Sequence, residues 1–200
     1  VYTIFNDKLI MPKKIAIFGS GSGSNAENIC SYFAQSPDIE VVLICTNNRD
    51  ALITKRAKKL NIPTHIFGKY ELNNFVNLQK KLREKRVDAI ILAGFLLKIP
   101  QKMIDIYPNR IINIHPSLLP KYGGRGMYGD NVHEAVIKNK EAESGISVHI
   151  VNQNYDEGKI ILQKKCSLSI NESKETLKQK IHDLERKYFP VAIEKMIKTL

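Results

Sequence analysis

Short apolar runs alternate with amphipathic segments over most of the chain. The runs are rich in branched and aromatic residues, as β-strands are, and the segments between them carry apolar residues at the spacing of one helix face. Strands are predicted at residues 15–18, 39–45, 62–66, 89–93, 111–115, 145–151 and 159–163, and helices at residues 27–33, 51–60 and 72–82. This alternation indicates a three-layer α/β sandwich around a mostly parallel sheet.

Three local patterns refine the predicted sandwich. The run at 89–93 is wholly apolar, as in a strand buried on both faces, whereas Pro63 places the run at 62–66 on a sheet edge. Ser173 is the predicted N-cap of a final helix, in which we expect Pro190 to cause an interruption or a kink. The apolar face of that helix consists of Leu177, Ile181, Leu184 and Tyr188.

The chain length fits a single domain. Its 200 residues, 43% of them hydrophobic, are enough to bury a core without disulfide staples. Met11-Pro12 reads as a start immediately before the first strand, so we expect residues 1–11 to be an N-terminal extension, native or not, and residues 12–200 to form the domain. No apolar run approaches the roughly 18 residues that span a bilayer, which predicts a soluble protein.

The net charge and the cysteine content indicate which ligands and which cellular compartment to expect. The formal charge of +11 favours anionic ligands, but the lysines are scattered and no nucleic-acid motif is present, so small phosphate- or carboxylate-bearing molecules are the better fit. Cys30, Cys45 and Cys166 lie far apart in apolar segments, which is typical of reduced thiols. We therefore expect a cytoplasmic protein without a structural metal.

The strand at residues 111–115 ends in polar side chains. Asn113 and His115 are two positions apart, so they project from the same face of a strand, and Pro116 ends the ladder because it has no backbone N–H. Burying an amide or an imidazole without partners costs about 1–3 kcal/mol per group. The pair is therefore either a candidate active site or a hydrogen-bonded strand end that anchors the next loop.

A glycine-rich loop follows the first predicted strand and precedes a helix. Its backbone N–H groups and the helix N-terminus favour an anion, most simply a phosphate. The loop lacks the Gly-Lys-Ser/Thr ending of a P-loop, and Ser24 replaces the third glycine of the dinucleotide fingerprint. The second strand ends at Cys45 without an acidic residue for a cofactor ribose. A phosphate site is thus favoured over a dinucleotide site or a flexible loop.

Two further stretches supply candidate residues. Residues 94–99 are apolar apart from Lys98, as in a slot for a flat heterocycle, although packing under the sheet edge would give the same pattern. Asp156 lies in the predicted turn at 154–158, where an Asp is usually a turn residue. It is also the carboxylate that a proton-transferring imidazole requires to stabilise its charged form.

Four motifs together resemble one enzyme family. They are the loop Gly21-Ser22-Gly23-Ser24-Asn25, the stretch Leu92-Ala93-Gly94-Phe95, the run Asn113-Ile114-His115-Pro116-Ser117-Leu118-Leu119-Pro120-Lys121-Tyr122, and Ser147-Val148-His149 followed by Asp156-x-Gly158. Over about residues 14–198 the chain resembles the folate-dependent phosphoribosylglycinamide formyltransferases of the formyltransferase superfamily. The resemblance implies a Rossmann-like, mixed seven-stranded sheet with one antiparallel strand near its end.

The resemblance also implies an activity and its residues. The family transfers the formyl group of 10-formyltetrahydrofolate to the amino group of glycinamide ribonucleotide in purine biosynthesis, without a metal. By position, Asn113, His115 and Asp156 match the catalytic trio, and Glu185 matches an acid that contacts the ribonucleotide. Gly23, Ser24 and Asn25 match the phosphate loop. The folate site would comprise Leu96, Leu97, Lys98, Ile99 and Asn113, with parts of the 148–156 segment.

This sequence departs from the family in the folate site. The family often has Met-Arg where this chain has Leu96-Leu97, which leaves Lys98 as the only base in that loop. An arginine used for the folate tail is also missing, with Lys69 as a candidate substitute. The stretch 123–129 is a subgroup variation to which the sequence assigns no role.

Three alternatives remain at this point. Formyltetrahydrofolate deformylase and methionyl-tRNA formyltransferase use similar chemistry but normally carry a further domain, for which we expect no room in this sequence; a deformylase-like hydrolase is the runner-up. A basic nucleic-acid-binding module is the alternative from another class. The favoured partners are glycinamide ribonucleotide and 10-formyltetrahydrofolate, without nucleic acid or membrane, for a monomer or weak dimer.

Overall fold

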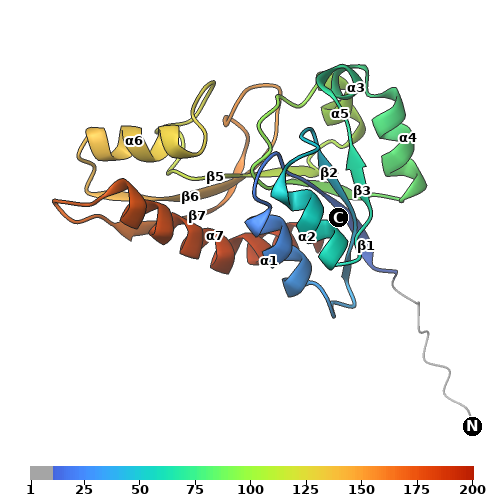
Figure 1. Cartoon of the computed structure of the whole chain (residues 1–200), viewed down its shortest axis with the longest axis horizontal. Helices are drawn as coiled ribbons and strands as arrows, with labels where there is room; N and C mark the ends of the chain where they lie inside the picture. Colours follow the sequence, from blue (N-terminus) through green and yellow to red (C-terminus); the bar gives the residue numbers. More distant parts are fainter. Residues whose placement is uncertain (1–10) are drawn as a thin grey trace, which may run out of the picture.

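Strands and helices alternate along the chain, as the apolar pattern predicts (Figure 1). The computed structural model describes residues 11–200, so the extension predicted at residues 1–11 falls almost entirely outside the described residues. The elements are β1 (Lys13–Phe18), α1 (Ser24–Tyr32), β2 (Ile39–Thr46), α2 (Leu52–Lys59), β3 (Thr64–Ile66), α3 (Lys69–Asn74), α4 (Val76–Glu84), β4 (Ala89–Leu92), α5 (Gln101–Ile106), β5 (Ile111–His115), α6 (Asp130–Lys138), β6 (Glu143–Ile150), β7 (Ile160–Ser167) and α7 (Lys174–Ile197).

The strands form one mixed sheet. It has seven strands in the order β3-β2-β1-β4-β5-β6-β7, with β1 to β5 parallel and β6 antiparallel to both of its neighbours. The mixed sheet, its single antiparallel strand near one end and the edge position of β3 are thereby confirmed. The strand order reverses between β1 and β4, and in such sheets the carboxyl ends of the strands at the reversal form a ligand-binding crevice.

Two hydrophobic cores cover the two faces of the sheet. Side chains of β1 alternate between them: Ile15 and Ile17 pack in the core shared with α1, α2, α6 and α7, whereas Ala16 and Phe18 pack in the core shared with α3, α4 and α5. The three-layer sandwich is therefore confirmed. In Figure 1 the long helix α7 runs alongside β6 and β7 towards α1, which it also contacts.

The helix predicted at residues 72–82 is wrong as a single element. The chain breaks at Phe75, which lies between α3 and α4 with a left-handed φ of 64° and a side chain only 1% exposed. Burial of the phenyl ring in the second core stabilises this turn against the intrinsic cost of a positive φ. Sequence periodicity continues across the break because both helices face the same core.

Two helices were not expected from the sequence. The short α5 has only one buried residue, Met103, so it carries no amphipathic repeat. In α6 the apolar pair Val132 and Val136 is buried at helical spacing, and this signal was obscured by the glycine-rich stretch before it.

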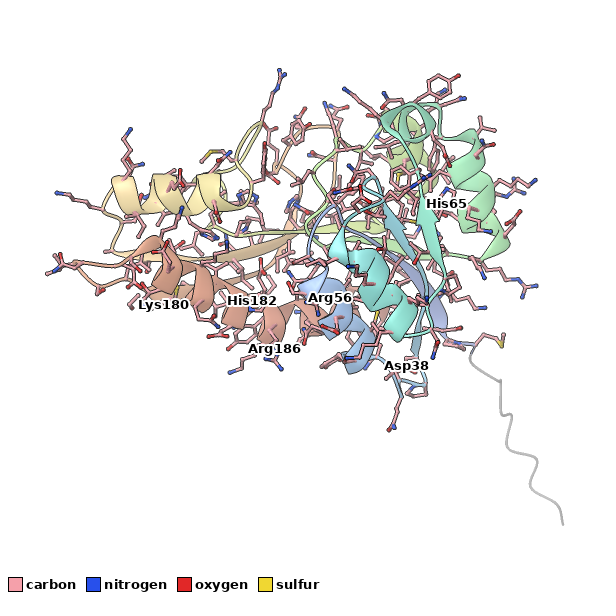
Figure 2. The ribbon with its side chains drawn as sticks, in the orientation of Figure 1. Asp38, Arg56, His65, Lys180, His182 and Arg186 are labelled. Atoms are coloured by element: carbon pink, nitrogen blue, oxygen red, sulfur yellow. The ribbon has the colours of Figure 1, made fainter. Side chains whose placement is uncertain are left out.

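Helix α7 passes through Pro190 as one assigned helix, so an interruption does not occur there. A proline cannot donate the backbone hydrogen bond to the carbonyl four residues earlier, here that of Arg186. That carbonyl accepts a hydrogen bond from the Asn28 side-chain amide at 2.8 Å instead. Figure 2 shows Arg186 on α7 at the level of α1, from which Asn28 comes.

Candidate active site

The residues predicted as functional line one cleft. It has a volume of about 700 Å³ and lies at the carboxyl ends of β1, β4 and β5, where the strand order reverses. Every candidate site residue of the sequence analysis contributes to its wall: Gly23, Ser24, Asn25, Leu96, Leu97, Lys98, Ile99, Asn113, His115, Asp156 and Glu185. Lys69, the candidate base for the folate tail, is exposed on α3 and is not among the residues that line the cleft.

The register of β5 against β6 adds a second histidine to the site. Asn113 pairs directly with His149 across the antiparallel ladder, so their side chains lie on the same face of the sheet. The Asn113 amide nitrogen lies 3.1 Å from His149 Nε2. His149 Nδ1 lies 3.1 Å from the carbonyl oxygen of Ile150, to which it donates, and Nε2 accepts from the Asn113 amide.

The Asp156 carboxylate joins the two histidines. Its Oδ2 lies 3.5 Å from His115 Nδ1, and its Oδ1 lies 3.5 Å from His149 Nε2. Oδ2 also accepts a hydrogen bond of 3.0 Å from the Gly124 N–H, and Oδ1 lies 3.4 Å from the Asn113 amide nitrogen. Asp156 is left-handed, with φ 57°, a conformation that Asp tolerates better than most residues. The predicted trio therefore converges, although 41 positions separate His115 from Asp156.

The hydrogen bonds of His115 define where it accepts a proton. Nε2 lies 2.7 Å from the Tyr122 carbonyl oxygen, which can only accept, so Nε2 carries the proton of the neutral ring. The free lone pair is consequently on Nδ1, on the side of Asp156. A proton taken up at Nδ1 would form an imidazolium that the carboxylate stabilises.

Burial and neighbouring charges shift the pKa values of His115 and Asp156. Burial lowers the pKa of His115 below its usual value, and the negative charge of Asp156 opposes that shift. Burial alone would raise the pKa of Asp156, but the contacts with His149, the charge of His115 and the Gly124 N–H together lower it. At neutral pH the site therefore holds a neutral imidazole next to an ionised carboxylate.

The glycine loop is shaped for an anion at the start of α1. Gly23 precedes the helix with a left-handed φ of 75°, and a Cβ there would lie 2.7 Å from the Ile53 side chain, so only glycine fits. Arg56 of α2 fixes the loop from outside: its Nε donates to the Ser22 carbonyl at 2.9 Å, and its guanidinium forms an ion pair with Glu27. The loop N–H groups and the helix N-terminus are left for a ligand.

Helix α7 closes the cleft beside this loop. The Asn25 amide donates to Glu185 Oε2 at 2.9 Å, which ties the loop to α7. Burial raises the pKa of Glu185, and the hydrogen bond from Asn25 partly opposes the shift. A carboxyl in this position can accept from, or once protonated donate to, the hydroxyl groups of a ligand.

An apolar slot occupies the other side of the cleft. Ile99 is buried and Leu96 is 50% exposed, so the loop after β4 presents apolar surface to the cleft. Ser20 holds this loop against the glycine loop, because its backbone N–H donates to the Gly94 carbonyl and its Oγ accepts from the Leu96 N–H, both at 3.0 Å. Lys98 lies 5.5 Å from the centre of the Tyr155 ring, at a cation–π distance.

Sequence reasoning missed part of the site. His149 had a signal, because Ser147 and His149 alternate with the apolar Ile146 and Val148 on a predicted strand. Only the register of β5 and β6, however, brings His149 opposite Asn113. The stretch from Gly124 to Gly129, which had no assigned role, lines the cleft and supplies the N–H that holds Asp156. His133 of the unpredicted α6 also lines the cleft.

Other features of residues 11–200 concern membranes, metals and thiols. Within these residues no helix is long and apolar enough to cross a membrane. In the same part of the chain, His, Cys, Asp and Glu residues form no group of three or more that could hold a metal ion. The thiols of Cys30, Cys45 and Cys166 are free, and burial raises the pKa of each of them.

The chain is similar in sequence to several phosphoribosylglycinamide formyltransferases. The phosphoribosylglycinamide formyltransferase of Bacillus subtilis is 33% identical over 190 residues, which are 92% of this chain and 95% of that protein. The chloroplastic enzyme of Arabidopsis thaliana is 37% identical over 185 residues, covering 88% of this chain. The chain spans only 63% of the Arabidopsis protein and 60% of its relative from Vigna unguiculata.

Solved structures and a family model agree with these relatives. The phosphoribosylglycinamide formyltransferase of Coxiella burnetii superposes with a TM-score of 0.85 at 35% identity, covering 94% of this chain and 88% of that one. The enzyme of Bacillus halodurans gives 0.82 at 32% identity, with 92% and 95% covered. The family model described as formyl transferase matches residues 13–193. Since this match includes all seven strands and the whole cleft wall, the chain belongs to the formyl transferase family.

Proposed function

We propose that the protein transfers the formyl group of 10-formyltetrahydrofolate to the amino group of glycinamide ribonucleotide, a step of purine biosynthesis. The observation that carries the proposal is the position of the Asp156 carboxylate, 3.5 Å from His115 Nδ1, in a cleft that also contains a phosphate-type loop. The loop at residues 23–25 supports a phosphorylated acceptor. The apolar slot at residues 96–99 supports a donor with a flat pteridine ring. The relatives are named phosphoribosylglycinamide formyltransferases, which is in line with the ribonucleotide acceptor and with transfer of a formyl group.

The reaction imposes three requirements on the site. The uncharged substrate amine attacks the formyl carbon, and negative charge develops on the formyl oxygen. The bond between the folate nitrogen N10 and the formyl carbon then breaks, and N10 gains the proton that the amine loses. His115 is neutral and has its lone pair on Nδ1, so it can receive the amine proton. Asp156 then stabilises the imidazolium until the proton passes to N10.

Asn113 is the proposed donor to the formyl oxygen. Its amide nitrogen already contacts His149 at 3.1 Å and Asp156 at 3.4 Å. The longer contact is the weaker one, so a substrate oxygen with developing charge can replace it while the bond to His149 keeps the amide in place. In this scheme His149 orients Asn113 and takes no proton itself.

One assay distinguishes the proposal from its rivals. Incubation with 10-formyltetrahydrofolate and glycinamide ribonucleotide should give formylated ribonucleotide in a one-to-one ratio with tetrahydrofolate, and free formate is measured in parallel. Formate release without formylated product would indicate the deformylase-like hydrolase. Strong, steeply salt-dependent binding to random RNA in the absence of any formyl transfer would indicate the nucleic-acid module.

The Arg56 contact gives a prediction for the phosphate loop. Arg56→Met removes the donor that fixes the Ser22 carbonyl, so the loop N–H groups lose their orientation. We expect the KM for glycinamide ribonucleotide to rise about fivefold to tenfold, in the range of one lost hydrogen bond. The KM for the folate and the kcat should change less than twofold. Lys59→Met, on the exposed last turn of the same helix, is the matched control, and an equal rise in both variants would contradict the role of Arg56.

His149 gives a second prediction in the catalytic site. His149→Phe keeps the ring volume but removes the acceptor for the Asn113 amide, which is partly buried and is then free to rotate. We expect kcat to fall about tenfold to a hundredfold, with each KM within about threefold of the wild-type value. Steady-state kinetics test this. A loss confined to the KM for either substrate would instead place His149 in binding.

A further inference from the structure

His133 has a hydrogen-bonding capacity that the fold does not use. It lies in the middle of α6 with 5% of its surface exposed, and it lines the cleft. Its Nδ1 is sealed from solvent and has no hydrogen-bond partner within residues 11–200. Because Nδ1 is sealed and the ring lines the cleft, Nε2 is the nitrogen that meets the cleft.

The surroundings of the ring determine where its proton is. Burial lowers the pKa of His133, and the nearby charges of Lys178 and Lys174 lower it further, against the opposing effect of Asp130. The ring is therefore neutral at pH 7 and carries one N–H. A buried N–H group without an acceptor costs more free energy than a buried nitrogen lone pair without a donor. The neutral ring therefore carries its proton on Nε2 and not on Nδ1.

The wall around His133 is the side of the cleft that adjoins the phosphate loop. On α7 the residues Lys178, Ile181, His182 and Glu185 follow one another at helical spacing, and all of them line the cleft. The hydrogen bond from Asn25 to Glu185 joins this face of α7 to the loop. Figure 2 shows His182 on the part of α7 that leads towards α1. The apolar folate slot comes from another element, the loop after β4.

Helix α6 is held against this wall by an ion pair. Lys178 contacts Asp130 Oδ1 at 2.9 Å, and Asp130 is the first residue of α6. The contact places His133, one turn further along α6, next to the same stretch of α7. An N–H donor in this position would meet the acceptor-rich end of a ligand whose phosphate occupies the glycine loop.

We infer that His133 binds the phosphoribosyl group of the acceptor substrate, by donating its Nε2–H to a phosphate or ribose oxygen. The inference rests on the proposed function for the identity of the acceptor. It gives His133 a binding role that is separate from proton transfer at His115.

Three substitutions separate the two ring nitrogens. A glutamine amide can reach the position of Nε2, an asparagine amide reaches only that of Nδ1, and leucine replaces neither. For His133→Asn and His133→Leu we expect the KM for glycinamide ribonucleotide to rise about tenfold, with the KM for the folate and kcat within about threefold of wild type. His133→Gln should remain within about threefold in all constants. His65→Asn, at a histidine that is hydrogen-bonded to Glu71 outside the cleft, is the control.

Binding of ribose 5-phosphate, measured by calorimetry, tests His133 without turnover. Wild type and His133→Gln should bind it, and His133→Asn should bind about tenfold more weakly. If the wild type binds but does not formylate, the proposed function fails and the inference stands. If turnover is normal and His133→Asn keeps wild-type affinity and KM, the inference fails and the function stands. Equal damage in the Gln, Asn and Leu variants, with equal losses in thermal midpoint, would also overturn it by showing a packing role.

Discussion

Replacing Asp156 by asparagine should lower kcat by about a hundredfold or more while leaving the binding of glycinamide ribonucleotide nearly intact. The change is isosteric, and asparagine tolerates the left-handed φ of 57° at this position, so the turn should persist. The amide oxygen can still accept from the Gly124 N–H. What is lost is the negative charge 3.5 Å from His115 Nδ1, which stabilises the imidazolium during proton transfer.

The pH dependence of the same variant distinguishes charge from geometry. Activity requires neutral His115, so kcat should fall as the pH is lowered through the His115 pKa, which burial places below its usual value. The Asp156 charge raises this pKa, so its removal should move the acidic fall in activity to lower pH. Asp105→Asn, at an exposed aspartate on α5, is the control. Activity near that of the wild type, or an unmoved acidic limb, would contradict the role of Asp156.

The fold was predictable because its main signals are local. Runs of branched residues alternate with amphipathic segments, and this pattern alone indicates the three layers and most strands. The errors occur where tertiary contacts override local preference. Phe75 adopts a positive φ because its ring fills the second core, and α7 passes Pro190 while Asn28 supplies a donor to the carbonyl that the proline leaves free.

The site was predictable to the extent that sequence spacing defines side-chain direction. Asn113 and His115 share a strand face by the period of two, and the glycine loop follows a strand, so both were visible in the sequence. The contact of His149 with Asn113 and the bond from the Gly124 N–H were not visible, because they depend on strand register and on the path of a glycine-rich loop. Asp156 belongs to the site only because its turn places the carboxylate between the two histidines.

Gly158 should tolerate no side chain, so its replacement by alanine should lower both the stability and the activity of the protein. A Cβ at this position would lie 1.6 Å from the Ile150 carbonyl oxygen and 3.3 Å from His149 Nδ1. Neither atom can give way freely, because the Ile150 carbonyl accepts from His149 Nδ1 and the Ile150 N–H donates to the Lys159 carbonyl at 2.9 Å. Overpacking of this kind typically costs 1–3 kcal/mol, so we expect stability to fall by about that amount.

The loss of activity in Gly158→Ala should exceed the loss of folded protein, since the turn that carries Asp156 must move away from β6. We expect kcat to fall at least about tenfold at a temperature where circular dichroism still reports a fully folded protein. Gly68→Ala is the matched control, because nothing lies within 4 Å of a Cβ there and its φ of −93° is ordinary for alanine. Full activity with a lowered thermal midpoint would mean that the turn relaxes without displacing the carboxylate, and it would contradict a role of Gly158 in positioning Asp156.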